Sequence, residues 1–265
     1  MDERRNVMKS RIFAVLCAVM AVLSLQGTQV IKCGETEITL VSRHFWNMNS
    51  LDFAGINLCR KLSYFGNVAR FECGWVGTGH KENKIGEKEL KVQFFADGKE
   101  FKPSRKKVEA KKFEMKKSSV LLDLQIDYDL TLEDGKLVER AKVTVLRDTD
   151  LKLLYLFMHP WCPLFEDAVC TRADGAEEKM SVSAIPRNKT VTRTDLASVC
   201  YIAPKEKLKA TSIVKALKPV PRGKELFLIW NRGVDRKLYF YPVHRQKFSA
   251  GENFEYELTT VIERI

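Results

Sequence analysis

The sequence contains few glycines and prolines, 14 and 8 among 265 residues. This scarcity excludes collagen-like and low-complexity fibrous chains, in which these two residues dominate the composition. The apolar fraction of 45% excludes a disordered chain, because disorder goes with low hydrophobicity. Beyond the first 26 residues no apolar run is long enough to span a bilayer, which excludes a polytopic membrane protein. A chain of this length can bury a large core in one or two domains.

Short motifs that mark many enzymes and metal sites are also missing. No C-x-x-C is present, so neither a zinc knuckle nor a thioredoxin-type redox pair is indicated. There is no serine nucleophile elbow, no phosphate-binding glycine loop and no paired metal motif. We therefore expect no cofactor and no metal. The absence of an internal repeat of fixed period disfavours a propeller or a solenoid.

The amino terminus resembles an export signal. Residues 1–11 carry Arg4, Arg5, Lys9 and Arg11, and residues 12–25 (IFAVLCAVMAVLSL) are apolar except for one serine. A basic stub before an apolar core of this length is typical of a secretory signal peptide, whereas a spanning helix needs about 20 residues. We predict a signal peptide over residues 1–26 and a secreted or periplasmic mature protein without a transmembrane span. An uncleaved membrane anchor is the alternative.

The chain is basic, with a formal charge of +11. Removing residues 1–26 takes away four basic and two acidic residues, which leaves +9. The lysines are spread through stretches such as 105–117 and 204–218 with acidic residues between them, which is typical of a solvated surface. We expect no nucleic-acid partner, since no compact basic patch with interleaved aromatics is present. An anionic partner, such as an acidic polysaccharide or a lipid headgroup, stays open. We expect a monomer.

Six cysteines lie beyond the predicted signal peptide. An even number in an exported chain permits disulfides, and six cysteines allow 15 pairings. The pairs Cys59–Cys73 and Cys162–Cys170 are close enough in sequence to close small loops. The alternative is buried free thiols, because cysteine is a common core residue. The sequence leaves the pairing open among Cys33, Cys59, Cys73, Cys162, Cys170 and Cys200.

Alternating hydrophobicity predicts strands along most of the chain. Leu122, Leu124, Ile126, Tyr128 and Leu130 share one parity, and the residues between them are polar. Such alternation indicates a strand with one buried and one solvated face. We expect strands over residues 29–43, 54–72, 89–96, 110–116, 119–132, 137–147, 151–158, 196–203, 225–231, 237–243 and 254–263.

The segments between these runs complete the predicted architecture. Asp-Gly pairs at 97–98 and 134–135 are typical of tight hairpin turns, and a third pair at 174–175 lies in a polar stretch. Residues 151–158 are apolar on both parities apart from Lys152, which predicts a central strand covered on both faces. Residues 205–217 are expected to be helical after Pro204, and residues 174–193 to be looser. We predict an all-β fold, a large antiparallel two-sheet sandwich with few short helices and a single domain over residues 27–265.

Three stretches resemble the galactose mutarotase-like supersandwich group. They run from Gly74 to Phe101, from Ser119 to Phe165 (ending in LYLFMHPWCPLF), and from Lys237 to Ile262. The resemblance covers most of the mature chain and is one of pattern. It implies a two-sheet β fold that binds sugar on its concave face.

The resemblance also implies roles for two histidines. His159-Pro160-Trp161 matches the place of a mutarotase histidine that follows a buried strand, precedes an aromatic and acts as general acid on the sugar ring oxygen. His80 is the loose counterpart of a second family histidine. The family's general base is a glutamate on a late strand, but the corresponding segment here, residues 238–246, contains none. The acid–base pair of the mutarotases is therefore incomplete at these positions.

The candidate catalytic residues are His159, His80 and Glu82. A histidine after a buried strand can transfer a proton near neutral pH, although it can equally be structural. His80 follows two glycines that let the backbone bend, and Glu82 lies close behind it as a possible acid–base partner. A surface loop without chemistry is the alternative for His80 and Glu82.

The candidate ligand-binding residues are Trp161, Trp75, Trp230 and Arg232. Sugars present apolar C–H faces that stack on indole rings, and a guanidinium can bind hydroxyls or a carboxylate. Core packing is the alternative for the tryptophans, and a surface ion pair for the arginine. Trp161 is favoured because we expect it in a loop just past a strand, beside His159.

These residues support three hypotheses of function. The leading one is an exported carbohydrate-binding protein. The second is an aldose 1-epimerase-like or polysaccharide-processing enzyme that uses His159 with His80 or Glu82. The third is an envelope structural or assembly module with no sugar site. We expect an enzyme to show two titratable groups within reach in one pocket, and a structural module to fill its concave face with its own side chains.

Overall fold

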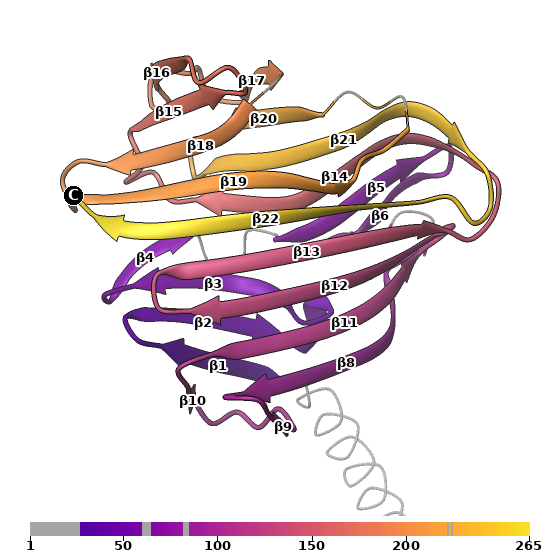
Figure 1. The fold of residues 1–265 in the computed structure, drawn as a ribbon, viewed down its shortest axis with the longest axis horizontal. Coiled ribbons are helices and arrows are strands. Elements are labelled where there is room, and N and C mark those ends of the chain that lie inside the picture. The colour runs from indigo at the N-terminus through magenta and orange to yellow at the C-terminus, as the bar shows by residue number, and fades with distance from the viewer. Residues whose placement is uncertain (1–26, 60–64, 82–84, 195, 222, 224) are drawn as a thin grey trace, which may run out of the picture.

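Two large β-sheets account for most of the chain in this computed structural model (Figure 1). The structure describes residues 27–59, 65–81, 85–194, 196–221, 223 and 225–265. The predicted signal peptide and Glu82 lie outside the described residues. No helix in the described part of the chain has the length and apolar character needed to cross a bilayer.

The first sheet has 12 strands, in the order β10-β1-β2-β3-β4-β14-β21-β20-β17, with β5, β6 and β7 joined through β14. All of its pairs are antiparallel except β1 with β10. A 3-10 helix, η1 (Ser42–His44), lies between β2 and β3. The strands are β1 (Thr28–Cys33), β2 (Thr36–Val41), β3 (Asn47–Phe53), β4 (Ile56–Cys59), β5 (Gly66–Phe71), β6 (Gly74–Gly77), β7 (His80–Lys81), β10 (Val108–Glu109), β14 (Thr149–Trp161), β17 (Lys189–Thr194), β20 (Leu226–Asn231) and β21 (Arg236–Phe248).

The second sheet has 10 strands and is antiparallel throughout, in the order β16-β15-β18-β19-β22-β13-β12-β11-β8-β9. Its strands are β8 (Lys88–Ala96), β9 (Lys99–Phe101), β11 (Phe113–Leu121), β12 (Leu124–Glu133), β13 (Lys136–Val145), β15 (Asp167–Arg172), β16 (Glu177–Ser181), β18 (Leu196–Ala203), β19 (Leu208–Lys218) and β22 (Asn253–Arg264).

One apolar core joins the two sheets. Phe240 of β21 meets Tyr256 of β22 with ring centroids 4.9 Å apart, so the inner faces of the two sheets are in contact. Along β12, buried and more exposed residues alternate as the sequence predicts. The prediction of an all-β, two-sheet antiparallel sandwich is confirmed.

The Asp-Gly pairs at 97–98 and 134–135 form the expected hairpins, and the pair at 174–175 forms a third. They join β8 to β9, β12 to β13 and β15 to β16, and each glycine has a positive φ. Central strand β14 pairs with β21 on one side and with β4 and β5 on the other. The looser segment over residues 174–193 contains two strands at sheet edges, β16 and part of β17, whose residues are mostly exposed.

The predicted helix over residues 205–217 is wrong. Those residues form a turn and then strand β19, which is hydrogen-bonded between β18 and β22. Its first five residues alternate between buried and half-buried (LKATS), and β-branched side chains such as Thr211, Ile213 and Val214 suit a strand. Pairing on both edges outweighs the helical propensity of the lysines and alanines.

The single strand expected over residues 119–132 is also wrong. A tight turn at Leu122 and Asp123 divides it into β11 and β12, and Leu122 has a φ of 56°. The turn contains neither glycine nor proline, and its one common turn residue is Asp123. The carboxylate of Asp123 accepts hydrogen bonds from Arg147 Nη2 at 2.5 Å and from Thr149 Oγ1 at 3.1 Å, which hold the turn from outside.

Cys59 and Cys170 are free thiols, so neither of the two small-loop disulfides is formed. Burial is the main cause that raises the pKa of the Cys59 thiol well above its usual value, and the nearby Cys162 adds to the shift. The alternative of buried thiols therefore describes these two residues.

Candidate functional site

A second apolar cluster lies on the outer face of the 12-stranded sheet, away from the core. Val68, Met158 and Tyr239 are its buried members, and four partly buried side chains pack against them: Trp75, Tyr155, Leu228 and Trp230. All seven come from β5, β6, β14, β20 and β21, and none comes from the 10-stranded sheet. An apolar cluster on a face that no other layer covers marks a binding surface.

This cluster forms the wall of a hollow of about 440 Å³, which we call the aromatic pocket. The rings of Tyr155 and Tyr239 lie 4.5 Å apart, and Trp75 stacks on Tyr155 at 6.0 Å and on His80 at 5.6 Å. Trp230 stacks on Tyr239 at 6.4 Å. Burial is the main cause that raises the pKa of both tyrosines, so their hydroxyls stay protonated hydrogen-bond donors. The lining residues are Val68, Trp75, Thr78, His80, Tyr155, Met158, Asn188, Thr190, Leu228, Trp230, Lys237 and Tyr239.

Lys237 places an amine in this aromatic pocket. Its side chain is only 4% exposed, and Nζ lies 5.2 Å from the centre of the Tyr239 ring. Burial, reinforced by the positive charge of Arg232, lowers the pKa of Lys237 to about 8, while Asp235 acts weakly in the opposite direction. The face of an aromatic ring partly replaces the water that this ammonium has lost.

Replacing Lys237 with methionine is expected to stabilise the protein at pH 7. The pKa of Lys237 in the folded state, about 8, lies below its usual 10.5, so the unfolded chain holds more protons between these two pH values. The contribution of Lys237 to stability therefore rises with pH from 8 to 10.5, and Lys237→Met removes the penalty present below pH 8. We expect the free energy of unfolding to rise by about 2 kcal/mol at pH 7 and to change little at pH 10.5. The value at pH 7 is smaller than the full pKa shift implies, because water in the pocket screens the charge. Urea unfolding at the two pH values measures it. Equal stability of the variant and the wild type at pH 7 would refute the expectation.

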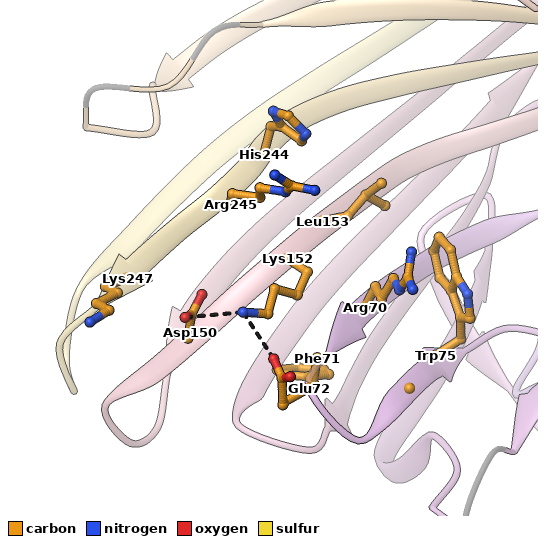
Figure 2. Close-up of a pocket in the computed structure, with 11 residues that line it drawn as sticks. Arg70, Phe71, Glu72, Trp75, Asp150, Lys152, Leu153, His244, Arg245 and Lys247 are labelled. Atoms are coloured by element: carbon orange, nitrogen blue, oxygen red, sulfur yellow. Dashed lines mark hydrogen bonds and ion pairs between the residues drawn. The ribbon is translucent and has the colours of Figure 1, made fainter.

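A larger hollow, of about 800 Å³, adjoins the aromatic pocket, and Trp75 lines both. We call it the basic pocket. Figure 2 shows Arg70 alongside Trp75, with Lys152 on β14 and Arg245 on β21 across from it. The Arg70 guanidinium lies 5.5 Å from the centre of the Trp75 ring. The remaining lining residues are Phe71, Glu72, Gly74, Asp150, Leu153, His244 and Lys247.

The structure brings together some of the residues singled out from the sequence and separates others. Trp75, His80 and Trp230 line the aromatic pocket, and Arg232 lies beside it with its guanidinium 5.5 Å from the Trp230 ring. Arg232 also pairs with Asp235 at 3.4 Å. The position of Glu82 lies outside the described residues.

His159 and Trp161 lie in the core and not at a pocket. Both side chains are 0% exposed, and Trp161 is the last residue of β14 and not part of a loop. The ring of Trp161 packs edge-on against Phe165 at 5.2 Å and lies 5.8 Å from Tyr201. The expectations that His159 faces a pocket and that Trp161 stacks on a ligand are therefore corrected.

A β-bulge in β14 is the physical reason for this correction. Tyr155 and Met158 both line the aromatic pocket although they are three residues apart, a spacing that puts side chains on opposite faces of a regular strand. The pairing of β14 with β5 shifts by one residue between them, and Phe157 has a φ of 53°. The extra residue reverses the alternation, so His159 and Trp161 point inward.

His159 instead belongs to a buried polar link between the two sheets. Its Nε2 lies 2.5 Å from Oε2 of Glu139, a residue of β13 that is 1% exposed. The hydroxyl of Tyr128 donates to Oε1 of the same carboxylate at 2.5 Å. Burial first, and then the charge of Glu139, raise the pKa of Tyr128 well above its usual value, which keeps it a donor. This link uses both oxygens of the one buried carboxylate.

Sequence reasoning missed Lys237, Tyr155 and Tyr239, which complete the aromatic pocket. Tyr239 and Lys237 share one parity on β21, and Trp230 is paired directly with Lys237 across β20 and β21. The signal available in the sequence was the pattern K-L-Y-F-Y, in which every second residue is amphipathic. Tyr155 was missed because its strand, residues 151–158, was expected to be covered on both faces.

No protein-family model and no curated protein matches the chain. Solved structures do match. They include the Slr1438 protein of Synechocystis sp. PCC 6803, with a TM-score of 0.58, 9% identity, and coverage of 90% of this chain and 96% of that one. A galactose mutarotase-like protein of Clostridium acetobutylicum matches with a TM-score of 0.51 and 9% identity, over 88% of this chain and 94% of that one. A protein of Escherichia coli K12, described as a candidate aldose 1-epimerase, matches with a TM-score of 0.50 and 9% identity, over 91% of this chain and all of that one. The chain has the fold of the galactose mutarotase-like proteins.

Proposed function

We propose that this chain is an exported carbohydrate-binding protein whose sugar occupies the aromatic pocket. The observation that supports this most directly is the set of aromatic faces around one hollow, from Trp75, Tyr155, Trp230 and Tyr239. Pyranose rings present C–H faces that pack on such rings, and the polar edges of the same side chains can bond to hydroxyls. The amino-terminal sequence, which resembles a secretory signal, supports export.

One unpartnered polar group and several polar side chains of the aromatic pocket support the same conclusion. Nε1 of Trp230 is buried and has no hydrogen-bond partner within the described residues. A buried N–H without an acceptor is costly, and a ligand oxygen would relieve that cost. Asn188, Thr190 and Thr78 add short polar side chains to the wall. An open hollow with these groups disfavours a purely structural module, in which the chain's own side chains would fill this face.

Binding requires only groups that the described lining contains. The lining offers ring faces, hydroxyls, an imidazole and an amine, whereas glycoside hydrolysis generally uses two carboxylates. His159, the residue that the resemblance implies as general acid, is held by Glu139 in the core. We therefore place binding ahead of catalysis.

A glycan array with the purified protein, followed by calorimetry on the best glycan, tests this proposal. Trp230→Ala should weaken binding about 30-fold, because a central tryptophan in an interface is typically worth about 2 kcal/mol or more. Phe95→Ala is a matched control: Phe95 is a half-buried aromatic of the 10-stranded sheet with a cation, Lys116, over its ring at 5.8 Å. It should bind as the wild type does. Absence of binding to every glycan on the array would refute the proposed function.

A further inference from the structure

The aromatic pocket contains a cation that the protein does not neutralise. Lys237 is 4% exposed, and within the described ranges its Nζ makes no hydrogen bond or ion pair; its one close interaction is with the face of Tyr239. Asp235, two residues away, is paired with Arg232 at 3.4 Å. A buried charge without a partner is costly, and an anion placed beside it recovers part of that cost. The pocket is therefore suited to a ligand that brings a negative charge.

The basic pocket offers more positive charge on the same face. Its lining includes four cationic side chains and two carboxylates. Both carboxylates are taken by one lysine, because Lys152 Nζ lies 2.9 Å from Glu72 and 3.2 Å from Asp150. Arg70, Arg245 and Lys247 make no ion pair with any residue that the structure describes. Two guanidiniums and an ammonium are thus available for a ligand (Figure 2).

Trp75 connects the two hollows. It lines both, stacks on Tyr155 toward the aromatic pocket, and carries the Arg70 guanidinium over its ring toward the basic pocket. A guanidinium that lies over an aromatic face keeps outer N–H groups available for a carboxylate or a sulfate. A sugar chain that crosses Trp75 would therefore meet Lys237 on one side and Arg70 on the other.

We propose that the ligand of this face is an acidic oligosaccharide, with one anionic group at Lys237 and a second, on an adjoining sugar, at Arg70 and Arg245. The inference rests on the proposed function and specifies its ligand class. Carboxylate and sulfate groups share the required chemistry. A neutral glycan would stack on the same rings but would leave the Lys237 ammonium unpaired.

Calorimetry with three probes tests this inference. They are an oligogalacturonate, the same oligosaccharide with its carboxyl groups reduced to alcohols, and a sulfated galactan oligosaccharide of equal length. The wild type should bind an acidic probe at least about tenfold more tightly than the reduced one at low salt, and the difference should shrink as salt screens the charges. The ratio between the first and third probes identifies which anionic group the site prefers.

Two variants locate the effect. Lys237→Met and the double variant Arg70→Gln/Arg245→Gln should each lose about tenfold more affinity for the acidic probe than for the reduced probe. Lys116→Met and Arg140→Gln are matched controls on the 10-stranded sheet: Lys116 lies over the ring of Phe95, and Arg140 is paired with Glu255. Thermal melts confirm that each variant folds. If Lys237→Met alters the structure of the aromatic pocket, the Arg70→Gln/Arg245→Gln variant still tests the inference independently.

The outcomes separate this inference from the proposed function. Equal affinity of the wild type for the acidic and reduced probes overturns the acidic ligand and leaves sugar binding intact. The same conclusion follows if both variants change the affinities for the two probes equally. Failure of all three probes, together with failure on the glycan array, overturns both.

Discussion

Glu139→Leu is expected to destabilise the fold by about 3–5 kcal/mol, because each of the two buried donors that lose their acceptor costs about 1–3 kcal/mol. The carboxylate of Glu139 is the shared acceptor for Tyr128 and His159, at 2.5 Å each, and it joins β13 of one sheet to β14 of the other. Leucine fills similar space but leaves a hydroxyl and an imidazole without an acceptor in the core. Urea unfolding followed by tryptophan fluorescence measures the loss.

Two further variants test the cause of this loss. Glu263→Leu removes a carboxylate that pairs with Lys209 at the surface at 3.2 Å, and should change stability by less than about 1 kcal/mol. Glu139→Leu/His159→Leu should recover part of the loss, because the imidazole is no longer left without an acceptor, whereas the Tyr128 hydroxyl still is. If the stability of Glu139→Leu lay within about 1 kcal/mol of the wild type, this would contradict the role assigned to the Glu139 carboxylate.

Trp75→Ala is expected to have the largest effect on ligand binding, a loss of about 100-fold. Its indole forms a wall of both hollows and contacts Tyr155, His80 and the Arg70 guanidinium. Removing it takes away a stacking surface and also the support that orients Arg70. The Kd for the best glycan, measured by calorimetry, gives the effect.

Comparison with Trp230→Ala makes this prediction specific. Trp230 lines the aromatic pocket but not the basic one, so its loss should weaken binding less than the loss of Trp75. Trp75→Phe should restore part of the affinity, since a smaller ring still stacks. A Trp75→Ala variant that binds as tightly as Trp230→Ala would show that the two hollows do not act on one ligand.

Local pattern was sufficient to predict the fold class, and long-range pairing explains where it failed. The alternation along β12 and the Asp-Gly turns are local signals, and both were interpreted correctly. One of the two strands that pair with β19 is β22, which lies far away in sequence. The turn at Leu122 is held by Asp123 through Arg147 and Thr149. Neither kind of support is visible in a short window of sequence.

The candidate site was predicted only in part for a related reason. Trp75, His80 and Trp230 were predicted because tryptophan and histidine are candidate binding residues by their chemistry alone, whatever the local structure. His159 and Trp161 were misplaced because the face on which they lie depends on a one-residue shift of register. Lys237 was missed, because a lysine in a basic chain is expected at the surface, and only the structure shows it buried beside Tyr239.

The extra residue at the middle of β14 has a wider consequence. Because it exchanges inside for outside over the rest of the strand, a single deletion near Phe157 would turn His159 and Trp161 toward solvent and Met158 toward the core. An insertion or deletion of this size can therefore exchange the whole chemical character of a binding surface in one evolutionary step. Equating residues between distant members of this fold by counting along a strand is unsafe unless such irregularities are first aligned.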